Sequence, residues 1–120
     1  HYAGEIDRIQ PSGALRLGGN CQGGVIMLAT AERLRARGRE IGRLILMEQS
    51  TFRAAPTFVD LVFGRESHLN PYHKPGAEPD RVFRDTYTDG YKVSFISGSH
   101  GEFFESPNIE SLAAIVRDRL

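Results

Sequence analysis

Side chains of three types that together could carry out nucleophilic catalysis occur in this 120-residue chain. Cys21, the one cysteine, could attack a carbonyl carbon, because a thiolate is a strong nucleophile. His100 could take the thiol proton as a general base. Glu48 or Glu66 could orient the imidazole and stabilise its charged form. In combination these residues indicate acyl transfer through a thiol, provided that the fold brings them together.

The residues around Cys21 follow the pattern Gly19-x-Cys21-x-Gly23. An apolar run, 14–17, precedes this pattern, and a helical periodicity, 25–37, follows it. A strand that turns sharply into a helix through Gly-x-nucleophile-x-Gly is a nucleophile elbow, in which glycines allow a strained turn and close packing of its neighbours. The pattern therefore favours Cys21 as a nucleophile.

The predicted elbow places Cys21 at the start of a helix, where the positive end of the helix dipole would favour the thiolate. The backbone N–H of Gln22 would point at an oxyanion forming on an attacked carbonyl, as one donor of an oxyanion hole. Two plainer interpretations stay open. Cys21 could be a small buried residue at a strand–helix junction, and His100 could be a loop or capping histidine.

Two other patterns do not support a cofactor site. His68 and His73 lie five residues apart in a loop rich in Pro and Asn, and without a third ligand we expect no metal site there. The stretch 18–24 loosely resembles a phosphate-binding loop, but it lacks both the Lys-Ser/Thr pair and the G-x-G-x-x-G pattern. We therefore expect no bound cofactor.

The composition excludes several classes of partner. Fifteen basic and fifteen acidic residues cancel, so that no global field indicates binding to nucleic acid or to an anionic membrane. No apolar run approaches the roughly 20 residues that span a bilayer. A lone cysteine and the lack of a visible signal peptide favour a cytoplasmic location. Five arginines between Arg33 and Arg43 are interpreted as a solvated helix face and its exit, or alternatively as a docking surface for an acidic carrier protein.

Apolar periodicity along the chain alternates between helices and strands. Helices are predicted over 1–10, 22–37, 79–87 and 107–120, and strands over 14–19, 43–48, 58–64 and 91–96. The strands are mostly continuous apolar runs and are expected to be buried, as in a parallel sheet covered on both faces. The predicted fold is therefore α/β, with three layers and a mostly parallel sheet of about four strands flanked by helices. Each candidate site residue follows a strand end, where functional groups collect in such sheets.

These features together resemble the thioesterase domains that end non-ribosomal peptide and polyketide synthases, within the α/β-hydrolase fold. The residues that carry the resemblance are the helix and turn before the elbow (2–13), the elbow with its doubled glycine (17–24) and the helix end after it (31–38). The next strand (44–48), the histidine loop (98–101) and the final helix (107–113) also match. In this family the triad aspartate usually ends the strand after the elbow. The resemblance therefore favours Glu48 over Glu66 as the acid, and Cys21 stands where serine is usual.

The chain also departs from the family pattern. It lacks the strands that precede the elbow, together with the loop that supplies the second oxyanion donor, and only 49–57 separates two strands where a helical lid is usual. A lid excludes water from the site. Residues 1–120 are thus expected to form one domain that resembles the carboxyl-terminal half of such an enzyme, a partial α/β-hydrolase fold. Because the first residue is not Met, we expect an excised piece of a longer chain. The missing strands and lid would also fit a naturally reduced relative.

The resemblance implies a thioesterase-like hydrolase or acyltransferase. It would release an acyl, peptidyl or polyketide chain from a carrier-protein thioester through an acyl-Cys21 intermediate. The substrate would arrive on phosphopantetheine, and the partners would be a carrier protein or an upstream synthase. The alternative is a non-catalytic, truncated fragment that serves as an assembly or carrier-docking module. Such a fragment would self-associate, because its elbow strand would be an exposed sheet edge.

Overall fold

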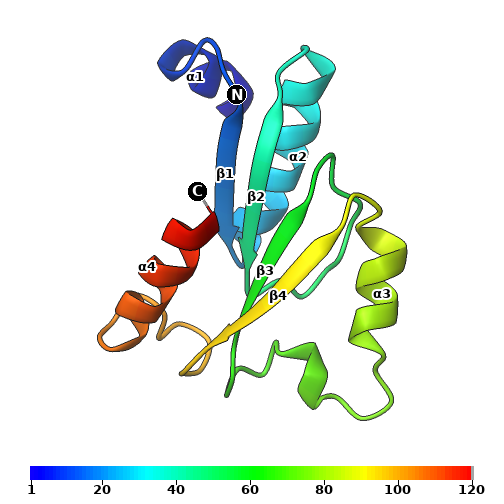
Figure 1. The fold of residues 1–120 in the computed structure, drawn as a ribbon, viewed down its shortest axis with the longest axis vertical. Coiled ribbons are helices and arrows are strands. Elements are labelled where there is room, and N and C mark those ends of the chain that lie inside the picture. Colours follow the sequence, from blue (N-terminus) through cyan, green and yellow to red (C-terminus); the bar gives the residue numbers. More distant parts are fainter. Residues whose placement is uncertain (120) are drawn as a thin grey trace.

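The computed structural model describes residues 1–119 and has the predicted α/β architecture (Figure 1). Its strands are β1 (Leu15–Asn20), β2 (Ile41–Met47), β3 (Val59–Gly64) and β4 (Tyr91–Ile96). Its helices are α1 (Tyr2–Ile9), α2 (Gln22–Ala36), the 3-10 turn η1 (Pro71–His73), α3 (Pro79–Thr86) and α4 (Asn108–Arg119). All eight predicted helices and strands are confirmed, with ends that differ by at most two residues. Leu120, the end of the last predicted helix, lies outside the described residues.

The four strands form one parallel sheet in the order β1-β2-β3-β4. Crossovers between parallel strands are right-handed. Because each strand is added on the same side of the preceding one, the crossover helices α2 and α3 must lie on the same face. A hydrophobic cluster indeed joins α1, α2 and α3 to that face, and a second cluster joins α4 to the other. Within residues 1–119, no helix has the length and hydropathy to cross a lipid bilayer.

The two faces of β3 are covered by these two clusters. Every residue of β3 is buried, as its continuous apolar sequence predicts. The first cluster is built mainly from Leu28, Leu34, Leu44, Leu61, Phe63 and Phe83, and the second from Ile45, Val62, Ile96, Phe103 and Leu112. The sheet therefore has a rigid centre from which loops extend at both ends.

The prediction that β1 is buried is wrong. β1 pairs only with β2 and forms an edge of the sheet, with Leu15 buried and Arg16 and Gly18 exposed. Its short apolar run is interrupted by an arginine, and such alternation is typical of a half-exposed strand. The strand that leads into Cys21 is thus open on one side.

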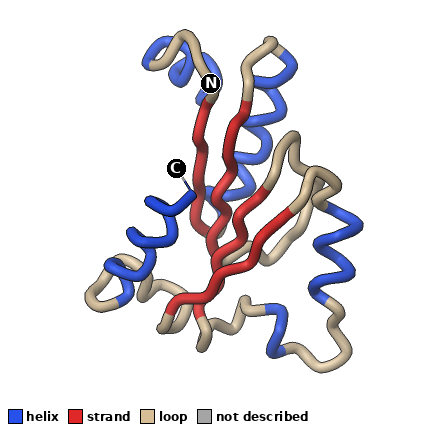
Figure 2. The backbone as a smooth tube through the Cα atoms, viewed as in Figure 1, coloured by secondary structure: helices blue, strands red, loops and turns tan. Residues whose placement is uncertain are grey.

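The arginines on α2 and at its end, 33–37, are exposed as predicted, whereas Arg39 and Arg43 are partly buried. Arg37 and Arg39 both bind the carboxylate of Asp7 and so tie α1 to the end of α2. Partial burial raises the pKa of Asp7, but hydrogen bonds and the positive charges of the two arginines outweigh it and lower the pKa below its usual value. In Figures 1 and 2, α1 and the end of α2 lie beside the amino-terminal ends of β1 and β2, opposite the loops that follow the carboxyl ends of the strands.

One buried charge connects α4 to the sheet. Asp60 of β3 is 2% exposed. Its Oδ1 accepts a hydrogen bond from Arg119 Nε at 2.8 Å, and its Oδ2 lies 3.1 Å from Arg43 Nε. Arg119 also donates to Ser94 Oγ at 3.2 Å. A single carboxylate thus links β2, β3, β4 and the last helix.

We expect Asp60→Ala to lower the free energy of unfolding by about 3–5 kcal/mol, because it leaves two partly buried guanidinium groups without their counter-charge. Urea denaturation followed by circular dichroism measures this loss. Asp85→Ala, on an exposed position of α3, is the matched control and should change stability by less than about 0.5 kcal/mol. Equal stability of the two variants would show that Asp60 does not anchor α4.

Tyr87 follows α3 and is 2% exposed, and its hydroxyl has no hydrogen-bond partner within residues 1–119. Burial raises its pKa to about 12. The unfolded chain loses this proton near its ordinary value of 10.0, so stability should fall as the pH rises from about 10 to 12.

We therefore expect Tyr87→Phe to be at least as stable as wild type at pH 7, by up to about 1 kcal/mol, since it removes an unpaired buried hydroxyl. It should also lose less stability between pH 9 and 12 in urea denaturation, although not all, because Tyr72 and Tyr91 also have raised pKa values. An alkaline loss identical to that of wild type would contradict the assignment to Tyr87.

Candidate active site

All four predicted candidates lie at the carboxyl-terminal edge of the sheet. Cys21 and Glu48 directly follow β1 and β2, Glu66 follows β3 by two residues, and His100 follows β4 by four. Figure 2 shows the loops that leave the strands at this edge. The parallel arrangement therefore gathers residues that are up to 79 positions apart in sequence.

Cys21 occupies a strained turn between β1 and α2. Its φ of 53° and ψ of −119° are unusual for a residue with a side chain. Its N–H donates to the Met47 carbonyl of β2 at 2.8 Å, and its side chain is partly exposed. A Cβ at Gly19 would overlap the backbone of Gly23, so the first glycine of the elbow pattern is required by close packing. Gly23 itself has open space where a Cβ would stand, so packing does not explain that glycine.

Gln49, a residue not predicted from the sequence, also holds this turn in place. Gln49 is 1% exposed, and its Nε2 donates to the Cys21 carbonyl at 2.8 Å and to the Met47 carbonyl at 3.3 Å. A Cβ at Gly24 would overlap the Gln49 amide. The doubled glycine was a usable signal, because a second glycine beside the elbow marks a place where another side chain approaches the helix backbone.

Glu48 and His100 are brought into contact. Glu48 is 1% exposed, and its Oε1 lies 3.3 Å from His100 Nδ1. The other carboxylate oxygen accepts from the Gly64 N–H at 3.4 Å. Glu48 also has a positive φ of 55°, and its N–H donates to the Val62 carbonyl at 2.9 Å. A carboxylate on Nδ1 leaves Nε2 free to exchange a proton with another group.

Glu66 binds the backbone of the histidine loop, 98–101. Its Oε2 accepts from the Gly98 N–H at 2.6 Å, and its own N–H donates to the Gly98 carbonyl at 3.2 Å. The side chain of Glu66 is exposed, unlike that of Glu48. Of the two competing carboxylates, the one in contact with the imidazole is Glu48, and Glu66 braces the loop on which the imidazole stands.

Four observations bear on what the site could do. Within residues 1–119 no hydrogen bond joins the Cys21 thiol to His100. In the same part of the chain the Gln22 N–H has no acceptor, so it remains available to a ligand oxygen. The His68 ring, a second feature missed from the sequence, packs edge-on against His100 with centroids 5.4 Å apart. No three His, Cys, Asp or Glu residues of the described chain are grouped so that they could hold a metal ion.

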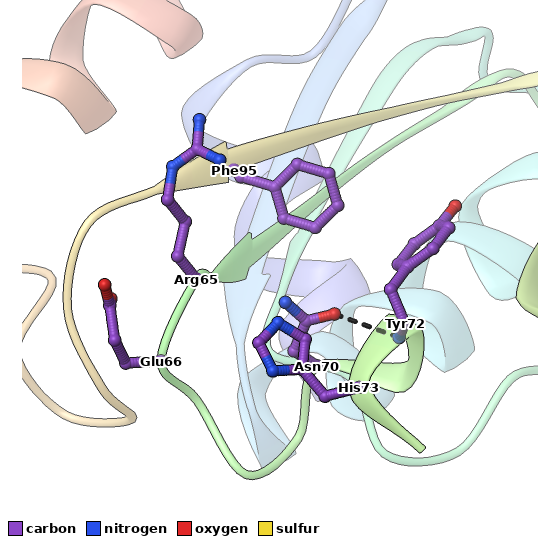
Figure 3. Close-up of a pocket in the computed structure, with 6 residues that line it drawn as sticks. All are labelled: Arg65, Glu66, Asn70, Tyr72, His73 and Phe95. Atoms are coloured by element: carbon purple, nitrogen blue, oxygen red, sulfur yellow. Dashed lines mark hydrogen bonds between the residues drawn. The ribbon is translucent and has the colours of Figure 1, made fainter. Parts of the chain in front are cut away.

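A cavity of about 530 Å³ lies beside Glu66 (Figure 3). Its lining residues are Arg65, Glu66, Asn70, Tyr72, His73 and Phe95. Burial and a 2.7 Å hydrogen bond to Asp80 raise the pKa of Tyr72, which therefore stays neutral. Asn70 Nδ2 donates to the Gly64 carbonyl at 3.3 Å, while the N–H of Gly64 binds Glu48. Gly64 thus connects Asn70 in the cavity wall to the candidate acid, and the cavity is large enough for a small organic group.

Comparisons with known proteins support the fold on which these residues lie. Residues 1–57 match the family model of the thioesterase domain. A comparison with curated protein sequences finds no match. Among similar solved structures is the thioesterase domain SrfTE, reported for cyclization of the lipopeptide antibiotic surfactin, with a TM-score of 0.77, 15% identity, and coverage of 98% of this chain and 72% of that one.

Two further structures have a TM-score of 0.72. The NocB thioesterase domain, solved in covalent complex with a nocardicin G analogue, is 18% identical over 98% of this chain and 70% of its own. The type II thioesterase BorB of the borrelidin biosynthetic cluster is 11% identical over 99% of this chain and 69% of its own. At these identities the structures establish the fold. Together with the family match over residues 1–57, they confirm the resemblance inferred from the sequence: this chain is similar to the thioesterase domains of non-ribosomal peptide and polyketide synthases.

Proposed function

We propose that the protein is a thioesterase-type hydrolase or acyltransferase in which Cys21 carries the acyl group. The observation that supports this best is that two residues with strained backbones lie at the same edge of the sheet. Cys21 and Glu48 are the non-glycine residues of the described chain with positive φ. They directly follow adjacent strands, and Glu48 contacts His100. Strained conformations concentrate at functional sites because the surrounding structure must over-determine them.

The chemistry starts with proton transfer from the Cys21 thiol to His100 Nε2. The thiolate attacks the thioester carbonyl, and the Gln22 N–H donates to the oxyanion. Collapse of the tetrahedral intermediate forms the acyl-Cys21 bond and breaks the substrate C–S bond, while imidazolium returns the proton to the departing thiolate. Water, an amine or a hydroxyl then attacks the acyl carbon, with His100 as base. The bond from this carbon to Cys21 Sγ breaks, and His100 returns the proton to the Cys21 thiolate. Glu48 orients the ring and stabilises its charged form.

The substrate in this proposal is an acyl chain on the phosphopantetheine arm of a carrier protein, as the resemblance implies. A thioester suits a thiol nucleophile, because transfer of the acyl group from the pantetheine thiol to the Cys21 thiol replaces one thioester by another with little change in free energy. The acyl-Cys21 thioester still reacts with water. The reaction needs Cys21 as a free thiol, which a reducing compartment maintains. The open edge of β1 motivates the alternative, a non-catalytic assembly or docking module, which would form no acyl intermediate.

Wild-type protein incubated with acyl-pantetheine thioesters should gain the mass of one acyl group, and Cys21→Ala should gain none. His100→Ala should acylate about 100- to 10,000-fold more slowly, because it removes the general base. Intact-mass spectrometry in a time course measures both. His1→Ala, on an exposed residue before α1, is the matched control for loss of a histidine.

An adduct on Cys21→Ala, or acylation of His100→Ala at the wild-type rate, would contradict the proposed roles of these residues. If wild-type protein of native circular dichroism forms no adduct with any thioester of the panel, the docking alternative is favoured instead.

Substitution of Glu48 and substitution of Glu66 should differ in their effect on the rate of acylation and its pH dependence. Glu48→Gln keeps the size of the side chain but removes the charge that stabilises imidazolium, so acylation should slow by about 100-fold or more and its pH midpoint should fall. Glu66→Gln retains an acceptor for the Gly98 N–H and should change the rate by less than about threefold. Single-turnover rates between pH 5 and 9 test this. A larger loss in Glu66→Gln than in Glu48→Gln would assign the acid to Glu66.

A further inference from the structure

We propose that Gln49 is a positioning residue, which holds the strained turn at Cys21 and thereby sets the reactivity of the thiol. The consequence for turnover rests on the proposed function. The geometric claim does not, because it concerns the conformation of Cys21 and can be measured with a simple alkylating agent. Gln49 itself does not reach the partly exposed thiol, since both its hydrogen bonds go to main-chain carbonyl groups.

The hydrogen bonds that Gln49 donates add to those that the backbone of Cys21 makes itself. The Cys21 N–H donates to the Met47 carbonyl, and Gln49 Nε2 donates to that same carbonyl and to the carbonyl of Cys21. The Cys21 carbonyl also accepts from the Gly24 N–H at 3.1 Å, the first turn of α2. Both main-chain polar groups of Cys21 are therefore fixed, one by β2 and one by the side chain that follows β2.

Gln49 also connects the two strained residues. It comes directly after Glu48, whose φ is 55°, and its amide binds Cys21, whose φ is 53°. The backbone that aims the Glu48 carboxylate at His100 thus also aims the Gln49 amide at the elbow. A change in this short segment would move the nucleophile and the acid together.

The surroundings of Gln49 indicate that it is retained for its hydrogen bonds. Its Oε1 is buried without a partner in the described chain, and an unpaired buried acceptor is destabilising. An apolar side chain of the same length would avoid this penalty. Gly24 leaves the space that the amide occupies. A bulky residue that only filled space would need no such polar group, so the donated bonds distinguish Gln49 from a packing residue.

The test uses Gln49→Met, which keeps the length of the side chain and removes the donor. Cys21 is the one cysteine, so its alkylation by iodoacetamide reports the reactivity of this thiol alone. We expect the variant to keep native circular dichroism and to alkylate about 10- to 100-fold more slowly at pH 7 than wild type, because the thiol is no longer held against the helix N-terminus. The pH midpoint of alkylation should rise. Gln10→Met, at an exposed glutamine after α1, is the matched control.

A second pair of variants keeps the proposal testable if Gln49→Met does not fold. Gly24→Ala should be destabilised by overlap with the Gln49 amide, and Gln49→Ala should leave a cavity. The double variant relieves the overlap and fills part of the cavity, so we expect it to be more stable than either single variant and still slow in alkylation.

Wild-type alkylation rate and pH midpoint in folded Gln49→Met, or in the folded double variant, would overturn the proposal and leave Gln49 as a packing residue. The acylation assay with acyl-pantetheine thioesters separates the two claims. If wild type forms no acyl adduct but Gln49→Met slows alkylation, the proposed function fails while the positioning role of Gln49 stands. If wild type acylates and Gln49→Met alkylates normally, only the positioning role fails.

Discussion

Parallel pairing of β1 with β2 is the interaction on which the site depends. The register sets Asn20 beside Met47, so the next residue of each strand, Cys21 and Glu48, leaves the sheet at the same place. The bond from the Cys21 N–H to the Met47 carbonyl continues this pairing into the turn. A shift of the register by one residue would move the thiol away from the carboxylate and reverse the faces of β1. The buried, continuous strands β2 and β3 resist such a shift, because their side chains are packed on both faces.

Polar groups are buried at the carboxyl edge in a way that favours function over stability. Glu48 and Gln49 are each 1% exposed, and Asn20 Oδ1 and Gln49 Oε1 have no partner within residues 1–119. Asp60, near the opposite end of β3, is buried too, but two arginines compensate its charge. The two ion pairs of Asp60 hold α4 in place, whereas two positive φ values are tolerated where a nucleophile and its partners must be aimed.

Much of this arrangement could be predicted because its signals are local. Apolar runs and glycine stops fix the strands and helices, and parallel topology then requires Cys21, Glu48, Glu66 and His100 to share an edge. The choice between Glu48 and Glu66 needed the resemblance, since both follow strands. The role of Gln49 and the His68 contact depend on distances between segments that no local pattern encodes. The partners of Arg37 and Arg39 were missed for the same reason, because Asp7 lies 30 residues before the first of them.

A crystal structure of the protein after reaction with a chloromethyl ketone analogue of an acyl-pantetheine would test the central claim most directly. A chloromethyl ketone places an electrophilic carbon beside a carbonyl group, so it labels the nucleophile and shows where the carbonyl oxygen is held. The account predicts a covalent bond to Cys21 Sγ, the ligand oxygen within hydrogen-bond distance of the Gln22 N–H, and His100 Nδ1 still on Glu48. Attachment at another residue, or a labelled Cys21 with His100 turned away from both the thiol and Glu48, would contradict it.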